Sequence, residues 1–385
     1  MDFTRLRVLV MDGGGKQTLA MVRGLKDIGC HVTVLCSTKM DTCYVSNKPD
    51  ERIVNPNLPE RNEETLKFLL KLVSTGKYDA LMPIGELSTN FVTEHEAGFS
   101  KYVKLACAPR DTYIKAFNKQ ITFDTAIENN IPCPYTRHSK QSIEDYLETC
   151  TFPIIIKPRQ GLGSIGFHKF EKREDFWPYM QEHNLNPDDY VVQGFVDYED
   201  RVSANIFVDQ RGYICTSYAV DALRWFPIDA GAGVLSETLD AHEVLEAAGK
   251  LLQKLGWKGF AQVAFMMDKK SGEPRLQEIN GRIPASIKMA YMLGYNISQQ
   301  MLEMAYEEDV VRYPENDKFG MYIRHFDTDL AWFFKSPNRF KAKPSWFSWK
   351  NTQEVLYSRD DRKPFWSHLL RKIFKYKEIM ERKKH

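Results

Sequence analysis

The chain has 385 residues, of which 43% are hydrophobic and 27% are charged, and its formal net charge is +2. This is the composition of an ordinary soluble protein, and the length suits two or three domains. The seven cysteines are odd in number and lack C-x-x-C spacing, which argues against a disulfide framework or a zinc site. No apolar run has transmembrane length, so we expect a cytoplasmic protein.

The first part of the chain alternates apolar strands with amphipathic helices. Leu6–Met11 predicts a strand, which is followed by a glycine-rich turn, a helix that ends at Gly29 and a second strand at His31–Cys36. A helix at Glu63–Val73 and a strand at Ala80–Met82 continue the alternation. Such repeats are typical of a parallel sheet covered by helices. We therefore expect an α/β domain that ends near residue 110.

After residue 110 the pattern changes to a helix followed by strands in hairpins. A helix is expected at Asp111–Asn130, a strand at Phe152–Lys157 with Gly166–Phe170 as its hairpin partner, and a second helix at Ala241–Leu255. Hairpin strands with few helices indicate an α+β domain. The other strands expected are Tyr190–Phe195, Val202–Val208, Tyr213–Val220, Phe260–Met267 and Pro274–Ile279.

The turn after the first strand reads Asp12-Gly13-Gly14-Gly15-Lys16. It lacks the G-x-G-x-x-G pattern, and the second strand ends in Cys36-Ser37, where a dinucleotide-binding domain places an acid for ribose. A helix N-terminus after glycines binds anions in general. We favour a tight strand-to-helix turn, or a site for a small acidic substrate, over a NAD site.

A lysine ends the apolar strand Pro153–Ile156 and precedes a glycine run at 161–166. Lys157 is placed to meet phosphate as a point charge, and the glycines let backbone N–H groups approach anionic oxygens. The alternative interpretation is a plain hairpin turn with a solvated lysine. The order of residues differs from a P-loop, in which the lysine follows the glycines.

The segment Gln277-Glu278-Ile279-Asn280-Gly281-Arg282 places a carboxylate, an amide and a guanidinium on one face of a strand. Carboxylate and amide oxygens suit Mg²⁺, which prefers oxygen ligands and often bridges to substrate phosphates. Glu278 and Asn280 are therefore candidate metal ligands. The alternative is a polar strand end without a ligand.

Arg224 precedes an aromatic pair and the segment Gly231-Ala232-Gly233, which we interpret as a loop. Two interpretations fit Arg224 equally well from the local sequence. It clamps an anionic substrate, or it is a solvated loop arginine.

Taken together, these segments resemble the ATP-grasp superfamily, specifically its carbamoyl-phosphate-synthase-like and amino-acid-ligase branches. The resemblance covers roughly residues 5–305 and also includes Met82-Pro83-Ile84-Gly85-Glu86 and Asn118-Lys119. It implies an α/β, Rossmann-like pre-ATP-grasp domain over 1–110, followed by an α+β ATP-grasp fold over 111–310 with a lid subdomain at about 120–190. Residues 311–385 would be a C-terminal basic and aromatic extension.

The resemblance also implies roles for individual residues. Glu278 and Asn280 would hold Mg²⁺, with Mn²⁺ as the alternative ion, and Arg282, together with Arg224, would steady the transferring phosphoryl group. The residues that would hold ATP are Lys119 and Lys157 at the phosphates, Gly161, Gly163 and Ser164 in a loop that closes over them, Gln193, Phe195 and Val196 at the adenine hinge, and Glu199 or Asp200 at the ribose.

One position departs from the family pattern. Such proteins usually carry Asp, Glu or Gln on the strand before the Glu-x-Asn pair, as another metal ligand, and Ala264 stands there in this chain. Gln262 and Asp268 share its face at different depths. Either one of them replaces the missing ligand, or a second metal ion is held weakly.

The function implied by the resemblance is an ATP-dependent carboxylate–amine ligase that acts through an acyl-phosphate. The alternatives are a phosphotransferase that stops at the phosphorylated product and, because of Ala264, a nucleotide-binding module without turnover. The expected partners are a small-molecule carboxylate and an amine, and no nucleic acid. The sequence does not specify the acid, the amine or the oligomeric state.

The C-terminal part is rich in basic residues, with 14 Lys and Arg against 5 Asp and Glu over 338–385. Residues 364–384 place Trp366, Leu369, Leu370 and Ile373 on one face of a predicted helix. A basic amphipathic helix suits peripheral contact with an anionic membrane surface. The alternative is a terminal helix that packs on its own domain.

Overall fold

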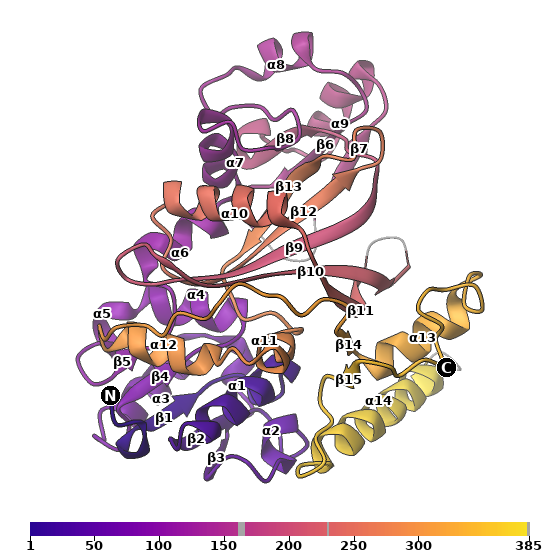
Figure 1. The fold of residues 1–385 in the computed structure, drawn as a ribbon. Helices are drawn as coiled ribbons and strands as arrows, with labels where there is room; N and C mark the ends of the chain where they lie inside the picture. Colours follow the sequence, from indigo (N-terminus) through magenta and orange to yellow (C-terminus); the bar gives the residue numbers. More distant parts are fainter. Residues whose placement is uncertain (161–165, 229–230, 383–385) are drawn as a thin grey trace.

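The computed structural model describes residues 1–160, 166–228 and 231–382, and the side chains among these up to residue 372. Figure 1 shows a parallel sheet at the bottom, a small sheet at the top and a large, mainly antiparallel sheet between them. The C-terminal part lies along one side. Short 3₁₀ helices occur at Phe3–Arg5, Leu58–Glu60, Arg173–Asp175 and Pro187–Asp189.

The N-terminal domain contains a five-stranded parallel sheet of order β3-β2-β1-β4-β5, which confirms the expected α/β class. Buried apolar side chains on both faces explain why the strands are short, continuous apolar runs. The strands are β1 (Arg7–Val10), β2 (His31–Cys36), β3 (Glu51–Val54), β4 (Ala80–Met82) and β5 (Lys104–Leu105). The helices are α1 (Lys16–Asp27), α2 (Thr42–Val45), α3 (Glu63–Val73), α4 (Glu86–Glu94) and α5 (Glu96–Phe99).

The helix expected at Asp111–Asn130 is two helices. They are α6 (Arg110–Phe117) and α7 (Lys119–Glu128). Asn118 separates them because its backbone is extended and its side chain accepts a hydrogen bond from the backbone N–H of Gln120, as an N-cap does. The break places Lys119 at the first turn of α7.

The small lobe is built on a three-stranded sheet of order β7-β6-β8. Its elements lie between residues 143 and 194, within or next to the region expected as a lid, and it has its own apolar core around Phe170 and Phe176. Its strands are β6 (Ile154–Pro158), β7 (His168–Phe170) and β8 (Tyr190–Gly194), and its helices include α8 (Ile143–Thr149) and α9 (Phe176–Glu182).

The large sheet has seven strands in the order β13-β12-β9-β10-β11-β14-β15, with α10 (His242–Lys254) packed against β9 and β10. Its strands are β9 (Tyr198–Val208), β10 (Ile214–Phe226), β11 (Ala232–Leu239), β12 (Gly259–Asp268), β13 (Pro274–Asn280), β14 (Tyr322–Arg324) and β15 (Thr352–Glu354). Of the segment expected as a loop at 231–233, Ala232 and Gly233 begin β11 instead. The last two strands come from the region expected as an extension, so that region completes the edge of this sheet.

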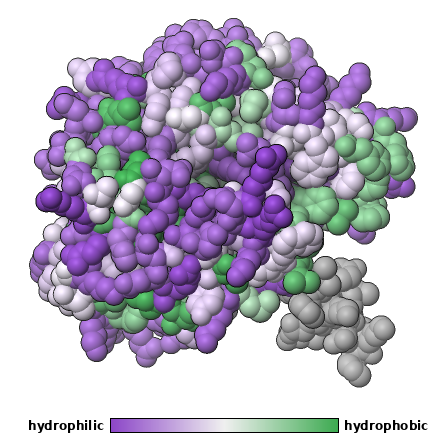
Figure 2. Space-filling view, turned by 60° about the horizontal axis from the view of Figure 1, so that its bottom comes forward, coloured by the Kyte–Doolittle hydropathy of each residue, from purple (hydrophilic) through white to green (hydrophobic). Residues whose placement is uncertain are grey.

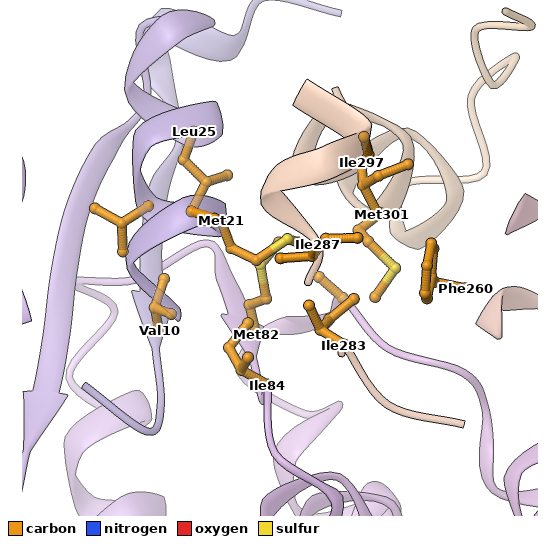
Figure 3. Close-up of a cluster of buried hydrophobic side chains, with 14 of the residues drawn as sticks. Val10, Met21, Leu25, Met82, Ile84, Phe260, Ile283, Ile287, Ile297 and Met301 are labelled. Atoms are coloured by element: carbon orange, nitrogen blue, oxygen red, sulfur yellow. The ribbon is translucent and has the colours of Figure 1, made fainter. Parts of the chain in front are cut away.

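The chain then returns to the N-terminal domain through α11 (Lys288–Leu293) and α12 (Ile297–Ala305), which pack on α1. Figure 3 shows Met21 of α1 pointing toward Ile287, and Met301 of α12 lying between Ile287 and Phe260. A Cβ atom on Gly24 would lie 2.4 Å from the ring of Tyr291, so glycine permits this close approach. One continuous apolar core therefore joins the parallel sheet to the large sheet.

The C-terminal part adds α13 (Phe326–Lys335) and α14 (Lys363–Arg382). The helix expected over 364–384 is therefore present, and its first turns pack against α2 of the N-terminal domain. Within the described ranges, no helix has both the length and the apolar character needed to cross a bilayer.

Candidate active site

The strands β12 and β13 form a hairpin with one buried face and one partly exposed polar face. Val263 pairs with Ile279 and Phe265 with Leu276, and all four side chains lie in the core. Gln262 opposite Asn280 and Ala264 opposite Glu278 share the other face. A register shift between Ala264 and Phe265 inserts Gln277 into β13 as a bulge. Without this bulge, Leu276 and Glu278 would share a face, so the bulge turns Glu278 away from the core.

Glu278, Asn280 and Arg282 form a row along that face, as the sequence predicts. The amide nitrogen of Asn280 donates to Glu278 Oε1 at 3.3 Å, and Arg282 Nη2 donates to Asn280 Oδ1 at 3.3 Å. These contacts hold three oxygen- and nitrogen-bearing groups side by side at the end of β13. A carboxylate, an amide and a guanidinium in a row can hold a cation and an anion next to each other.

Lys157 of the small lobe reaches this row. It ends β6, and its Nζ donates to the backbone carbonyl of Gln277 at 2.9 Å and lies 4.4 Å from the centre of the Phe123 ring. Burial lowers the pKa of Lys157 to about 8, although the charge of Glu278 opposes this shift. Two residues 121 positions apart are thus brought together, as the predicted phosphate and metal sites require.

Lys119 and Glu86 complete the set of charged groups, which we call the Glu278 cluster: Glu86, Lys119, Lys157, Glu278, Asn280 and Arg282. The positive charge of Lys119 lowers the pKa of both Lys157 and Glu86, so Lys119 lies near both. Glu86 was not predicted as a site residue. It begins α4, directly after the Gly85 N-cap, and burial together with the charge of Glu278 raises its pKa.

A signal for Glu86 was present in the sequence, because it follows β4 at the carboxyl end of the parallel sheet. Ligands of open α/β sheets bind outside this edge. Glu86 enters the cluster from the N-terminal domain, Lys157 from the small lobe and Glu278 from the large sheet, while Lys119 begins α7, which packs in the core of the large sheet. All three parts of the molecule therefore contribute charge to one place.

The donors in the cluster fit a hard cation such as Mg²⁺ or Mn²⁺ only in part. Within the described ranges, no group of three or more His, Cys, Asp and Glu residues could hold a metal ion. Gln262 lies directly opposite Asn280, and its amide nitrogen donates to Asn205 at 3.5 Å, so its amide oxygen is the atom suited to a cation. Asp268 lies in the turn of the hairpin, where its carboxylate accepts hydrogen bonds from the N–H groups of Lys270 and Ser271. Of the two replacements considered for Ala264, the geometry favours Gln262.

The predicted adenine hinge lies at the end of β8. The side chain of Gln193 is buried and donates to Thr136 Oγ1 at 2.7 Å, and its backbone pairs with Ile155 of β6, so Gln193 itself is engaged within the protein. The backbone N–H of Phe195 donates to the carbonyl of Pro153 at 2.9 Å, and Lys169 lies over the Phe195 ring. Gly194, Phe195 and Val196 line a hollow of about 620 Å³ together with Asp268 and Arg275.

The remaining predicted nucleotide-binding residues are exposed or fall outside the described ranges. Glu199 forms an exposed ion pair with Lys269 at 3.7 Å, and Asp200 is exposed next to it at the start of β9. Gly161, Gly163 and Ser164, and with them most of the predicted closing loop, lie outside the residues that the structure describes. Gly166, which ends that loop, has a φ of +78°.

Arg224 has partners other than those expected. Its side chain is buried, and Nη1 forms an ion pair with Asp329 of α13 at 3.3 Å. Nη2 donates to the carbonyl of Pro344, and the guanidinium lies 4.8 Å from the centre of the Trp332 ring. These contacts commit Arg224 to the C-terminal part of the chain instead of the Glu278 cluster.

The glycine-rich turn after β1 is a tight strand-to-helix connection. A Cβ atom on Gly13 would lie 2.8 Å from the carbonyl oxygen of Leu35, and Asp12 accepts a hydrogen bond from the N–H of Gly85 at 2.8 Å. Lys16 donates to Asp327 at 2.6 Å. The turn thus ties β1 to the β4–α4 connection, and its lysine binds a carboxylate from the C-terminal part.

Part of the chain matches a known protein family. Residues 116–286 match the model of the ATP-grasp domain. The chain is 19% identical over 285 residues to the N-terminal section of the carbamoyl phosphate synthase large chain of Methanopyrus kandleri, which covers 69% of this chain and 50% of that protein. It is 26% identical over 203 residues to the alpha-aminoadipate–LysW ligase LysX of Saccharolobus solfataricus, covering 51% of this chain and 72% of that protein.

Among solved structures, the chain resembles the biotin carboxylase of Campylobacter jejuni, with a TM-score of 0.66 and 17% identity over 84% of this chain and 75% of that one. At this identity the likeness concerns the fold. These findings confirm the resemblance to the ATP-grasp superfamily and the predicted fold class. The chain spans half of the Methanopyrus relative and 27% of the carbamoyl phosphate synthase large chain of Methanothermobacter thermautotrophicus.

Proposed function

We propose that the protein is an ATP-dependent carboxylate–amine ligase that forms an acyl-phosphate intermediate and uses Mg²⁺. The observation that carries this proposal is the position of Lys157. This lysine of the small lobe lies against β13 beside Glu278, so the phosphates of a nucleotide held between the two parts would meet a cation from one side and a metal-binding carboxylate from the other. The relatives named above include a ligase and a synthase chain.

The reaction has two steps. An oxygen of the substrate carboxylate attacks the γ-phosphorus of ATP, the bond from that phosphorus to the bridging oxygen breaks, and ADP leaves. The amine nitrogen then attacks the acyl carbon, inorganic phosphate leaves with the electron pair, and the nitrogen loses a proton. Phosphoryl transfer requires positioning and charge neutralisation more than covalent catalysis. This explains why charged residues, without a nucleophile, make up the Glu278 cluster.

Each residue of the cluster has a role in this scheme. Lys119 and Lys157 would neutralise the phosphates, and Arg282 would hold the transferring phosphoryl group or the acyl-phosphate. Glu278 and Asn280, with Gln262 opposite, would hold Mg²⁺, which when bound would withdraw negative charge from the phosphate oxygens. The hinge at Gly194–Val196 would bind the adenine through backbone groups. Arg224 is not part of the scheme, because Asp329 binds it.

The proposal is tested by incubating the protein with Mg-ATP and sets of small carboxylic acids and amines, and measuring ADP and phosphate. Hydroxylamine, added in place of the amine, should trap an acyl-phosphate as a hydroxamate that mass spectrometry detects. Release of ADP with an acid alone, and of a stable phosphorylated product, would indicate a phosphotransferase instead.

A second candidate is a nucleotide-binding module without turnover. Ala264 favours it, because proteins that the chain resembles usually carry Asp, Glu or Gln at this position as a metal ligand in addition to the Glu-x-Asn pair. Tight binding of Mg-ATP without ADP release across the whole substrate set would support this candidate. Loss of nucleotide binding in the Lys157→Met variant would then still identify the site.

A further inference from the structure

The C-terminal part carries an exposed surface in which aromatic and basic side chains alternate. Its aromatic members are Phe334, Phe340, Phe347 and Trp349, whose exposed fractions are 70%, 73%, 64% and 48%. The lysines between them or next to them are Lys335, Lys341, Lys343 and Lys350, all exposed. We call these eight residues the aromatic–basic surface. The rings of Phe334, Phe340 and Phe347 gather around the ring of Phe333, with centres 5.5–5.8 Å from its centre. A gathered apolar patch that stays exposed calls for an explanation.

Charge is one-sided over the same segment. Between Asp329 and Glu354 the chain contains five basic residues and no acidic residue. Arg339 is the fifth, and it lies 5.3 Å from the centre of the Phe340 ring. The surface therefore offers apolar rings and positive charges, and no negative charge. Its complement is a target that has a negatively charged outer layer above an apolar layer.

The surface is held in place from below by a buried ionic group. Asp329 of α13 accepts hydrogen bonds from Arg224 of β10 and Arg324 of β14. Arg324 also donates to the carbonyl of Trp346 at 2.9 Å, and the indole N–H of Trp346 donates to the carbonyl of Asp329 at 3.2 Å. The segment that carries the exposed rings is therefore anchored to the large sheet and to α13. Because the backbone of this segment is already fixed, binding costs less conformational entropy than it would for a flexible segment.

The surface stands on a projection. Figure 1 shows α13 and the chain that follows it extending from the side of the molecule, away from the sheets that contribute to the Glu278 cluster. Figure 2 shows hydrophobic colour gathered on that projecting part, at the right-hand edge of the view. A projecting surface can reach a flat target without the rest of the molecule colliding with it.

We propose that the aromatic–basic surface binds the interface of an anionic phospholipid bilayer. Its phenylalanines would enter the boundary between headgroups and acyl chains, while its lysines remain at the level of the lipid phosphates. The proposal does not depend on the ligase activity. Single-stranded nucleic acid also binds basic surfaces with aromatic rings, but such sites combine a groove with stacking platforms, whereas this one projects.

This surface is distinct from the helix expected at the membrane. In the described part of α14, Phe365 packs against Phe326, His368 binds Asp327 at 3.1 Å and Arg371 binds Asp41 at 3.2 Å. These contacts orient the first turns of α14 toward the body of the protein. The inference therefore shifts the membrane contact from residues 364–384 to residues 334–350, which precede that helix.

Co-sedimentation of the full chain with vesicles of phosphatidylcholine, with and without phosphatidylglycerol, tests the proposal. Binding should require the anionic lipid and should fall as salt is raised, because the Debye length shortens. Replacing Phe334, Phe340 and Phe347 by Ser should abolish sedimentation. Replacing the four lysines by Gln should weaken partitioning by roughly fivefold per lysine, up to the loss of detectable binding. Brominated lipids should quench tryptophan fluorescence in the parent and not in the phenylalanine variant.

Matched controls keep the test specific. Exposed aromatic residues elsewhere, Tyr102, Tyr213 and Phe319, are replaced by Ser in one control, and the exposed Lys71, Lys101, Lys140 and Lys254 by Gln in the other. Both controls should sediment like the parent, and all variants should match its circular dichroism spectrum and unfolding midpoint. The proposal is overturned if the parent stays in the supernatant with anionic vesicles at low salt. It is also overturned if the controls lose binding equally, or if the surface proves to mediate only oligonucleotide binding or self-association.

Discussion

Two groups of buried charges in the described part of the molecule, the Glu278 cluster and the ion pairs of Asp327 and Asp329, are partnered differently. In the Glu278 cluster, burial lowers the pKa of Lys157 to about 8 and raises that of Glu86, so burial disfavours the charged form of each group. In the C-terminal part, burial works against Asp327, yet the hydrogen bond from His368 and the charge of Lys16 hold its pKa well below the usual range.

The difference in partners fits a structural role for one group and the proposed binding role for the other. Asp329, with two arginines, and Asp327, with Lys16 and His368, are saturated by ion pairs within the chain and stabilise the docking of α13 and α14. The Glu278 cluster holds charges that a bound nucleotide and cation would compensate. Shifts in pKa that favour the neutral form of a charged group are common in binding and catalytic sites. Variants in the two centres should therefore fail in different ways.

The largest effect is expected for Asp329→Ala, which leaves Arg224 and Arg324 buried without their carboxylate. Removing one partner of a buried ion pair costs about 3–5 kcal/mol, so the free energy of unfolding should fall by that amount. Urea unfolding measures it. The control Glu63→Ala breaks an exposed pair with Lys67 and should leave stability unchanged. If the Asp329→Ala protein is stable but has lost turnover, Arg224 would have a role in the active site. The two groups of buried charges would then not differ in function.

Glu278→Gln should act on turnover instead of stability. Loss of the carboxylate that would hold the metal should lower ADP release by about 100-fold or more, the scale of losing one preorganised electrostatic group. Adenosine binding, measured by calorimetry, should remain, because the hinge is separate. The control Glu273→Gln, on the same hairpin and paired with Arg275, should leave both unchanged. Parallel loss of stability and adenosine binding would give Glu278 a structural role.

Lys157→Met should weaken Mg-ATP binding and leave the protein at least as stable as the parent. The charge lost from the phosphates is worth about 1.5–3 kcal/mol of binding free energy, while methionine removes the cost of burying an ammonium group. A lower affinity for Mg-ATP together with an unchanged or higher free energy of unfolding would distinguish Lys157→Met clearly from Asp329→Ala, which is expected to lower stability. Unchanged affinity, with Lys254→Met as the control, would show that Lys157 does not meet the phosphates.

The same residue predicts a pH dependence. Because the pKa of Lys157 in the free protein is about 8, the site loses this charge as pH rises through that value. Affinity for Mg-ATP should be level below about pH 8 and fall above it, since binding then requires the uptake of a proton. Calorimetry in buffers of different ionisation enthalpy would detect the proton. The Lys157→Met variant should show neither the fall nor the uptake.

The smallest effect is expected at Gln262. If its amide oxygen replaces the ligand missing at Ala264, Gln262→Ala should raise the Mg²⁺ concentration needed for half-maximal nucleotide binding by about 2- to 10-fold, the scale of one uncharged polar partner. Ala264→Asp should lower it. A Gln262→Ala variant with the parental Mg²⁺ requirement would leave Glu278 and Asn280 as the only contributors from this hairpin.

Local sequence was sufficient for elements whose signals are local. The predicted strand at His31–Cys36 and helix at Glu63–Val73 match β2 and α3, because apolar periodicity and caps such as Asn62, which accepts from the N–H of Thr65, mark them within a few residues. The predicted helix at 111–130 missed its break, because Asn118 caps α7 inside a pattern that otherwise continues. The whole of β11 was missed, and its beginning was interpreted as a loop because Gly231 and Gly233 are typical of loops.

The candidate site was predictable where spacing along one strand determines which side chains share a face, as for Glu278, Asn280 and Arg282. Partners that are distant in sequence were not predictable. Arg224 binds Asp329, 105 residues later, and Glu86 joins groups on two other parts of the fold. No local pattern encodes such pairs, because the tertiary fold decides which of many arginines meets which carboxylate. The proximity of Lys157 and Glu278 was predicted from the family resemblance and not from the local sequence.

The return of α11 and α12 to the N-terminal domain has a consequence for how the chain is made. The apolar face of α1 is covered by residues 283–304, and Ser298 and Asn296 bind the carbonyls of Met21 and Gly24. On a ribosome, these covering residues emerge roughly 10–40 s after the parallel sheet has been synthesised. During that interval the nascent domain presents an uncovered apolar helix, which is a natural substrate for a chaperone. A gene cut near residue 110 would make this transient exposure permanent.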